Sequence, residues 1–337
     1  MKKLLTIVAS IAVVAAATSL LLQRGHITAQ EGPPQLSLSD AEHSAHIFPT
    51  VAGAAALGEL GALSGPLLYQ GGPVMTGSVT TYAIFWLPAS GKLQNGNPTS
   101  MSAHYQTVQK NLLGDYPAHG IDNNNTQYYQ IVGTVTTYIQ NKGSLGGSYV
   151  DTSAYPASGC NDSATPGNCI TDAQIQTEIQ NVMTLKGWTG AINKMFLLFT
   201  SSGEGSCFDS TSTSCAYVQY CAYHSYFLSG TTPVIYGNEP YGNTSVCQAP
   251  GIPSPNGDPI ADTAATSASH ELSEAITDPE GSAWYTASGY EIGDLCAYNY
   301  GVNTWDSAKA NQMWNGRFYE LQQEYDNHTG SCVQVGP

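Results

Sequence analysis

The cysteines constrain the fold of this chain more than any other feature of its sequence. There are eight, an even number, and all lie between Cys160 and Cys332. In an exported protein such a set predicts four disulfides. One sequence does not fix the connectivity, but Cys160 with Cys169 would close a loop rich in Gly, Asn, Asp and Pro, and Cys296 with Cys332 would tie the C-terminal strand back. The alternative, a thiolate metal cluster, is disfavoured because the sequence contains no C-x-x-C pair.

The N-terminus predicts export from the cytoplasm. A Met-Lys-Lys start precedes an apolar and small-residue run over residues 4–22, and a small-residue cleavage pattern follows at 27–29. We therefore interpret residues 1–29 as a secretory signal peptide, after whose removal no stable membrane association is expected. The alternative is a signal anchor, because the apolar run is just long enough to span a bilayer. Both interpretations place the rest of the chain outside the cytoplasm, so we expect a secreted protein, extracellular or in the cell envelope.

The remaining sequence predicts one folded domain behind a connecting segment. Residues 30–70 are rich in Ala, Gly, Leu, Ser and Pro without clear periodicity, which is typical of a linker or a pro-segment. Residues 71–337 are expected to form a single, disulfide-stabilised domain in which strand and helix patterns alternate, and this order predicts a mixed α/β fold. Strands are predicted at 79–87, 127–139, 192–200, 216–227 and 233–236, and helices at 100–113, 171–185 and 261–277.

The charge distribution excludes one class of function and indicates another. The chain has 10 basic and 25 acidic residues, a formal net charge of -15, which excludes a nucleic-acid binder that works by neutralising phosphates. No Lys or Arg occurs from Met195 to Ala308, yet residues 258–294 hold 8 of the 25 acidic side chains. Clustered carboxylates raise each other's pKa unless a cation neutralises them. We interpret the cluster as a metal site; a solvated acidic face and ion pairs with distant Lys or Arg are the alternatives.

A helical motif inside this acidic stretch gives the metal site its first residues. His270 and Glu274 are four residues apart and project from one helix face, while Glu271 is offset by one position. Zincin peptidases arrange H-E-x-x-H in this way, with metal ligands at i and i+4 and the intervening Glu as general base. Here Glu274 stands in place of the second His. The sequence therefore predicts a zincin-like site for zinc, with calcium, manganese and magnesium as competitors.

Further candidate residues lie outside this helix. Glu291 and Asp294 follow Glu274 by 17 and 20 residues, so either suits a third metal ligand, and either could instead be a surface or turn residue. His224 lies on a predicted strand and could be a ligand, an electrophile in the cleft, or a packed core histidine. Together these residues predict a metal-dependent hydrolase, with a peptidase as first choice, in which Glu271 deprotonates water.

A different class of function competes with the hydrolase. In this second hypothesis the chain is a non-catalytic extracellular binding protein, its acidic cluster holds a structural calcium ion, and its Tyr-rich surface contacts glycan or cell wall. The partner would be a peptide or a cell-wall glycan in either case. The two hypotheses differ in whether the metal supports hydrolysis or only the folded state.

Several segments of the chain together resemble one known family. They are Gly71-Gly72-Pro73-Val74, Tyr220 to His224, His270-Glu271-Leu272-x-Glu274, Asp278-Pro279, Ala283-Trp284-Tyr285 and Glu291-Ile292-Gly293-Asp294-Leu295-Cys296. The resemblance is to the phosphate-induced protein 1 (EXORDIUM-like) family, and it covers roughly residues 71–335. It implies an extracellular or cell-wall-associated protein with one continuous domain. The hydrolase hypothesis does not come from this resemblance but from the residues of the helix and of the loop that follows it.

Overall fold

The computed structural model describes residues 37–39, 44–59, 65–305 and 307–337, so the predicted signal peptide over 1–29 lies outside the described residues. The helices are α2 (Val51–Glu59), α3 (Ala103–Asp115), α4 (Gly120–Asn125), α5 (Asp172–Lys186), α6 (Pro259–Thr277) and the 3-10 helix η1 (Asp294–Cys296). The strands are β1 (Ser37–Ser39), β2 (Ser44–Pro49), β3 (Leu68–Tyr69), β4 (Val79–Trp86), β5 (Tyr129–Val132), β6 (Val135–Tyr138), β7 (Gly143–Asp151), β8 (Cys169–Thr171), β9 (Lys194–Thr200), β10 (Gly205–Cys207), β11 (Tyr220–Ser229), β12 (Thr232–Glu239), β13 (Trp284–Tyr285), β14 (Gln312–Trp314), β15 (Arg317–Tyr319), β16 (Glu324–Asp326) and β17 (Ser331–Val333).

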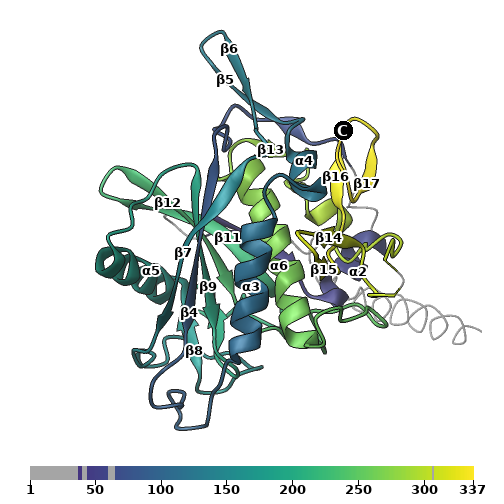
Figure 1. The fold of residues 1–337 in the computed structure, drawn as a ribbon. Helices are drawn as coiled ribbons and strands as arrows, with labels where there is room; N and C mark the ends of the chain where they lie inside the picture. The colour runs from purple at the N-terminus through teal and green to yellow at the C-terminus, as the bar shows by residue number, and fades with distance from the viewer. Residues whose placement is uncertain (1–36, 40–43, 60–64, 306) are drawn as a thin grey trace, which may run out of the picture. The chain divides into compact units, whose positions relative to one another are not determined.

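A seven-stranded mixed sheet forms the centre of this part of the chain, in the order β1-β2-β11-β12-β9-β4-β7 (Figure 1). The neighbours among β12, β9, β4 and β7 run parallel, whereas β11 is antiparallel to both β12 and β2. Helix α5 lies on one face of the sheet, and α3 and α6 lie on the other (Figure 1). Parallel strands covered by helices on both faces define an α/β layer structure, so the predicted mixed α/β class is confirmed.

The alternation of side chains along β4 explains how two hydrophobic cores share one strand. Tyr82, Ile84 and Trp86 pack into the core on the α5 side, whereas Ala83 and Phe85 pack into the core beneath α3 and α6. Successive strand residues point to opposite faces of a sheet, and both faces of this sheet are covered. The strand therefore reads as a continuous run of buried residues, and the prediction of a strand over 79–87 is confirmed.

Two of the predicted helices begin and end at clear signals. In α5, the Thr171 side chain and Gln174 form a capping box, and Gly187 adopts a left-handed conformation (φ 68°) just after the last turn. The prediction of a helix over 171–185 is thus confirmed. Helix α3, predicted over 100–113, begins only at Ala103, because Ser102 is its cap: the Ser102 hydroxyl accepts a hydrogen bond from the Tyr105 backbone N–H at 2.9 Å.

Helix α6, predicted over 261–277, lies inside the molecule along nearly its whole length. The Asp258 side chain accepts a hydrogen bond from the backbone N–H of Ala261 at 3.2 Å, and Pro259 occupies the first turn, where a missing N–H costs nothing. Every residue from Ala261 to Thr277 is buried. Polar side chains on this helix therefore lack contact with water and must find partners inside the protein.

All eight cysteines form disulfides, as the even count predicted. The pairs are Cys160–Cys169, Cys207–Cys215, Cys221–Cys247 and Cys296–Cys332. The two pairings considered from the sequence, the first and the last, are confirmed. Multiple disulfides are typical of an oxidising compartment outside the cytoplasm. Among the described residues, no helix combines the length and the apolar character needed to cross a membrane.

The segment interpreted as a linker or pro-segment is partly built into the sheet. Strand β2 pairs antiparallel with β11, and Leu57 in the following helix α2 is completely buried. Residues 44–59 are therefore not a plain linker. The alternative, a pro-segment that folds onto the domain, stays a prediction. No local pattern predicts β2, because six residues that end in a proline are too few to establish a strand period.

Candidate metal centre

Six side chains from three parts of the chain converge beside the sheet. Helix α6 contributes His270, Glu271 and Glu274, strand β11 contributes His224, and the segment leading into η1 contributes Glu291 and Asp294. We call these six residues the His/carboxylate cluster. Each side chain is at most 2% exposed. The structure thus brings together every site residue predicted from the sequence.

The cluster contains two overlapping groups of potential metal ligands. One group is His270, Glu271 and Glu274, and the other is His224, Glu274 and Glu291; within each, one ligand atom per residue lies within 4.8 Å of the others. His270 Nε2 is 3.1 Å from Glu274 Oε1, and His224 Nδ1 is 3.6 Å from Glu274 Oε2. Glu274 therefore belongs to both groups and presents one carboxylate oxygen to each histidine.

Several of these close atoms make no hydrogen bond. Among the described residues, His270 Nε2, Glu274 Oε2, Asp294 Oδ1 and both carboxylate oxygens of Glu291 are buried without a hydrogen-bond partner. Buried polar atoms are almost always hydrogen-bonded, because leaving them unpaired costs about 1–3 kcal/mol each. Ligands of one cation are brought close without hydrogen bonds between them, since each lies about 2.0–2.6 Å from the ion. The donor set therefore fits a divalent metal.

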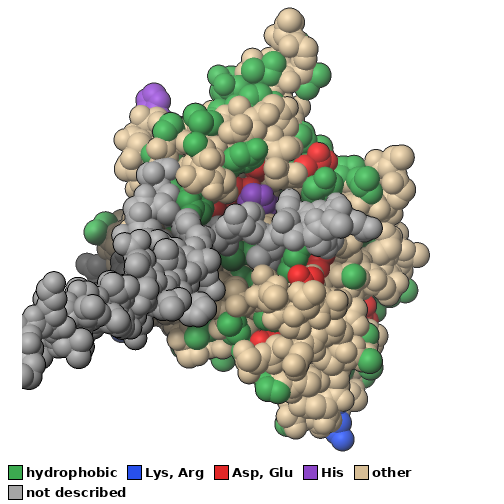
Figure 2. Space-filling model, turned by 180° about the vertical axis from the view of Figure 1, so that it is seen from behind, with side chains coloured by type: hydrophobic (Ala, Val, Ile, Leu, Met, Phe, Trp, Pro, Cys, Tyr) green, Lys and Arg blue, Asp and Glu red, His purple; other side chains and the backbone are tan. Residues whose placement is uncertain are grey.

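The electrostatics of the cluster fit a cation equally well. Burial raises the pKa of Glu271, Glu274 and Glu291 well above the usual range, and repulsion from neighbouring carboxylates adds to the rise. Burial lowers the pKa of His270 to about 4 and that of His224 well below its ordinary value. In the described part of the chain no Lys or Arg forms an ion pair with the cluster, and Figure 2 shows few basic side chains on the face it draws. Neutral imidazoles are the form that binds metals.

Glu291 and Asp294, between which the sequence did not choose, have different surroundings. Glu291 belongs to a ligand group, with Oε2 at 3.6 Å from His224 Nε2. Asp294 Oδ2 accepts a hydrogen bond from the Glu291 backbone N–H at 2.8 Å, and the Asp294 backbone N–H donates to Glu274 Oε1 at 3.1 Å. Asp294 Oδ1 is 3.9 Å from His270 Nε2. The geometry favours Glu291 as a ligand and Asp294 as the residue that positions Glu291 and Glu274.

Sequence reasoning missed one histidine that reaches the cluster. His46 on β2 places Nδ1 3.0 Å from Glu291 Oε1, and its ring stacks on that of His224 with 5.5 Å between centroids. Burial lowers the pKa of His46 to about 4. The histidine lies in a segment without periodicity, more than 170 residues before β11. No local pattern could have connected His46 with the cluster.

Two residues near the C-terminus were also missed. The Gln322 side-chain amide lies 2.9 Å from His270 Nδ1, so its orientation decides which ring nitrogen carries the proton. The amide nitrogen of Gln322 faces His270 Nδ1 and also donates to the Gly293 carbonyl at 3.0 Å, so Gln322 presents a donor to the ring. Metal binding at Nε2 therefore requires the amide to turn over, so that its oxygen accepts the Nδ1 proton. Glu324 is completely buried, and neither of its carboxylate oxygens has a hydrogen-bond partner within the described residues. Both residues belong to a segment that the sequence analysis assigned no role.

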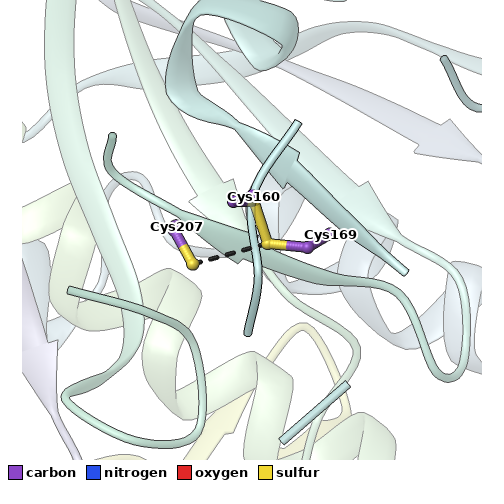
Figure 3. A group of neighbouring side chains, drawn as sticks. All are labelled: Cys160, Cys169 and Cys207. Carbon is purple, nitrogen blue, oxygen red and sulfur yellow. Dashed lines mark hydrogen bonds between the residues drawn. A yellow bond between two sulfur atoms is a disulfide. The ribbon is translucent and has the colours of Figure 1, made fainter. Parts of the chain in front are cut away.

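Three cysteines outside the His/carboxylate cluster also lie close together, but they do not form a metal site. Figure 3 shows Cys160 and Cys169 joined by a disulfide, with Cys207 beside them. The sulfur atoms of Cys207 and Cys169 are 3.4 Å apart. Cys207 is itself bonded to Cys215. Only a thiolate binds a metal, and a disulfide sulfur is not one. The contact therefore joins two disulfides, in agreement with the prediction that the cysteines form bridges.

No protein-family model, curated protein or solved structure gives a significant match to this chain. The resemblance to the phosphate-induced protein 1 family stays a prediction from the sequence segments that carry it.

Proposed function

We propose that the chain is a secreted, metal-dependent hydrolase with a zincin-like site, and that its substrates are peptides. One observation carries the proposal: two histidines and four carboxylates converge in a buried volume, at separations of 3.1–3.9 Å between facing nitrogen and oxygen atoms, and no Lys or Arg of the described residues pairs with them. The proposal also draws on the H-E-x-x-E motif of α6 and on the disulfides, which suit an exported protein.

The proposal gives each residue of the cluster a role. His270, Glu274 and Glu291 are the ligands, and Glu274 links them, because it shares one ligand group with His270 and the other with Glu291. His224 is a further ligand or a proton donor to substrate. A divalent metal, when bound, supplies Lewis acidity that makes a water easier to deprotonate. Glu271 is the general base: its Oε2 lies 3.1 Å from His224 Nδ1, so a proton accepted by Glu271 has a neighbouring imidazole to receive it. Asp294 positions Glu291 by accepting a hydrogen bond from the Glu291 backbone N–H.

Zinc suits this donor set better than calcium does. Calcium takes oxygen ligands, whereas imidazole nitrogen is a preferred ligand of zinc and other transition metals. Each ligand group contains a histidine, and the structure adds His46 next to Glu291. The nitrogen atoms at the site therefore favour zinc and leave calcium as the alternative.

Metal analysis of the purified protein tests the proposal directly. We expect one equivalent of zinc in the wild type and its loss in His270→Ala and Glu274→Gln. Glu280→Gln is the matched control, because Glu280 carries the same charge six residues further along and stands outside both ligand groups.

Glu271→Gln separates catalysis from metal binding. This variant should retain the metal but lose peptide hydrolysis by a factor of about 10²–10⁴. A folded wild-type protein that binds no zinc would contradict the proposal. Unchanged hydrolysis in Glu271→Gln would refute the assigned base.

A non-catalytic binding protein is the second candidate, and two observations favour it. The complete burial of Glu271, Glu274 and Glu291 suits a structural metal. Separately, a surface pocket of about 510 Å³ is lined by amide side chains and by Trp305, a residue that is 40% exposed, and this combination suits a sugar. If this candidate is correct, Trp305→Ala abolishes glycan binding and Glu271→Gln changes no activity.

A further inference from the structure

Strand β2 occupies the edge of β11, the strand that carries His224. The two strands are antiparallel, with His46 opposite His224 and Phe48 opposite Ala222. On its other side, within the described residues, β2 pairs with the three-residue strand β1 alone. A sheet edge presents unpaired backbone groups that an extended peptide can complete. Without β2, the strand next to the cluster would present such an edge.

Residues of β2 touch the cluster at three places. The Phe48 backbone N–H donates to Glu271 Oε1 at 3.0 Å, and the Phe48 ring lies 4.7 Å from that of His270. His46 Nδ1 lies 3.0 Å from Glu291 Oε1. The proposed base and two proposed ligands are therefore in contact with β2. A base whose oxygen accepts a backbone hydrogen bond is hindered from accepting a proton from water.

The Phe48 side chain fills a defined apolar pocket. Phe48 is completely buried and packs in a small core with Ala222 and with the Cys221–Cys247 disulfide, and its ring lies 4.8 Å from that of Tyr298. His46 and Phe48 are two residues apart and so point to the same side of the strand, whereas Ile47 packs into the core on the opposite face. For an extended peptide in the place of β2, backbone hydrogen bonds to β11 would supply affinity. The pocket of Phe48 would select a large apolar side chain.

Access to the cluster requires that a covering segment leaves, and β2 is in direct contact with the cluster. Glu271, Glu274 and Glu291 are 0% exposed while β2 is in place, so a polymeric substrate cannot reach them. We propose that the edge of β11 and the Phe48 pocket form a binding site for an extended peptide with a large apolar residue, and that Ser44–Pro49 is its built-in occupant. The segment acts as an inhibitory strand that resembles substrate. This inference rests on the proposed hydrolase for its catalytic consequence, but the peptide site itself can be tested apart from activity.

An exchange experiment on the full chain tests the peptide site. A recognition sequence for a specific protease is inserted directly after Glu59, and the folded protein is cleaved there. A fluorescein-labelled peptide with the sequence of residues 44–59 is then added, and binding is followed by fluorescence anisotropy. We expect binding to the cleaved protein and none to the uncleaved one. Phe48→Ala in the peptide should weaken binding at least about tenfold, and Ala52→Ser, at an exposed position, should leave it unchanged.

The outcomes distinguish the two proposals. Failure of the peptide to exchange, loss of the fold on cleavage, or equal binding of the Phe48→Ala peptide would each show that β2 is an ordinary structural strand and overturn the inference. Peptide exchange together with a gain of hydrolysis after cleavage supports both proposals. Exchange without hydrolysis by the zinc-loaded protein would refute the proposed hydrolase and leave the peptide site standing.

Discussion

The imidazole of His270 lies directly against the backbone of Gly293, so that a Cβ atom on residue 293 would overlap the ring at Nδ1, Cγ and Cε1. The backbone of Gly293 has φ −77°, a conformation open to any residue. Glycine is therefore required here for space and not for conformation. The segment that delivers Asp294 thus also fixes the position of a proposed metal ligand on α6.

Gly293→Ala should displace the His270 ring and lower zinc affinity at least about tenfold, as loss of a positioning contact commonly does. Destabilisation of about 1–3 kcal/mol is expected from the overpacking. Gly114→Ala in α3 is the control, because a Cβ there meets only Leu145 at an ordinary 3.9 Å. Zinc titration of the two variants, with thermal melting alongside, measures both effects. Equal zinc affinity in Gly293→Ala and the wild type would contradict a ligand role for His270.

Chelation should destabilise the protein by leaving the cluster of buried carboxylates without a counter-charge. A metal present at a thousand times its dissociation constant stabilises the folded state by about 4 kcal/mol, and for a chain of this size that corresponds to roughly 8 °C in melting temperature. Calorimetry before and after treatment with a chelator measures the shift. Zinc should restore the melting temperature and calcium should not. Full recovery with calcium alone would favour the structural calcium site.

Glu178 in α5 should make stability depend on pH at a place remote from the cluster. Burial, with the Asp151 carboxylate adding to it, raises the pKa of Glu178 from its ordinary 4.5 to about 9. Because the folded state holds the proton more tightly, its stabilisation is complete below pH 4.5 and is lost as the pH rises toward 9. Urea unfolding of Glu178→Gln should show a growing advantage over the wild type from pH 5 to pH 9. A constant difference across this range would show that Glu178 titrates normally.

The Cys296–Cys332 disulfide should matter to the cluster as well as to stability. It spans 36 residues, so its removal should cost about 4 kcal/mol, against about 2.6 kcal/mol for the Cys160–Cys169 bridge, which spans 9. Cys296 lies in η1 together with Asp294. Replacing both cysteines of the longer bridge with serine should therefore also weaken zinc binding, and the same change in the shorter bridge should not. Equal zinc affinity in the two double variants would separate the disulfide from the site.

The parts of the fold that follow from local chemistry could be predicted. Helix α6 is delimited by Asp258 and Pro259 at one end and by Pro279 just beyond the other, and these signals are readable without a structure. The same helix places His270 and Glu274 on one face by its period alone. The even number of cysteines predicted their complete pairing.

The parts that depend on long-range pairing could not be predicted. Strand β2 is stabilised by β11, far along the chain, and its six residues carry no period of their own. His46 and Gln322 reach the cluster only because the sheet and the C-terminal segment fold around α6. The choice between Glu291 and Asp294 likewise rested on three-dimensional distances, since both residues lie at a plausible spacing from Glu274.

The contact of Gln322 with His270 has a consequence for the order of events during synthesis. The proposed site combines His224 with residues of α6 and of η1, and one of its imidazoles is oriented by a residue that is translated 52 positions later. A chain that emerges from its N-terminus therefore cannot complete the site until nearly all of it has been made. Metal acquisition would then be a late step of folding, one that follows the synthesis of η1 and of the C-terminal segment.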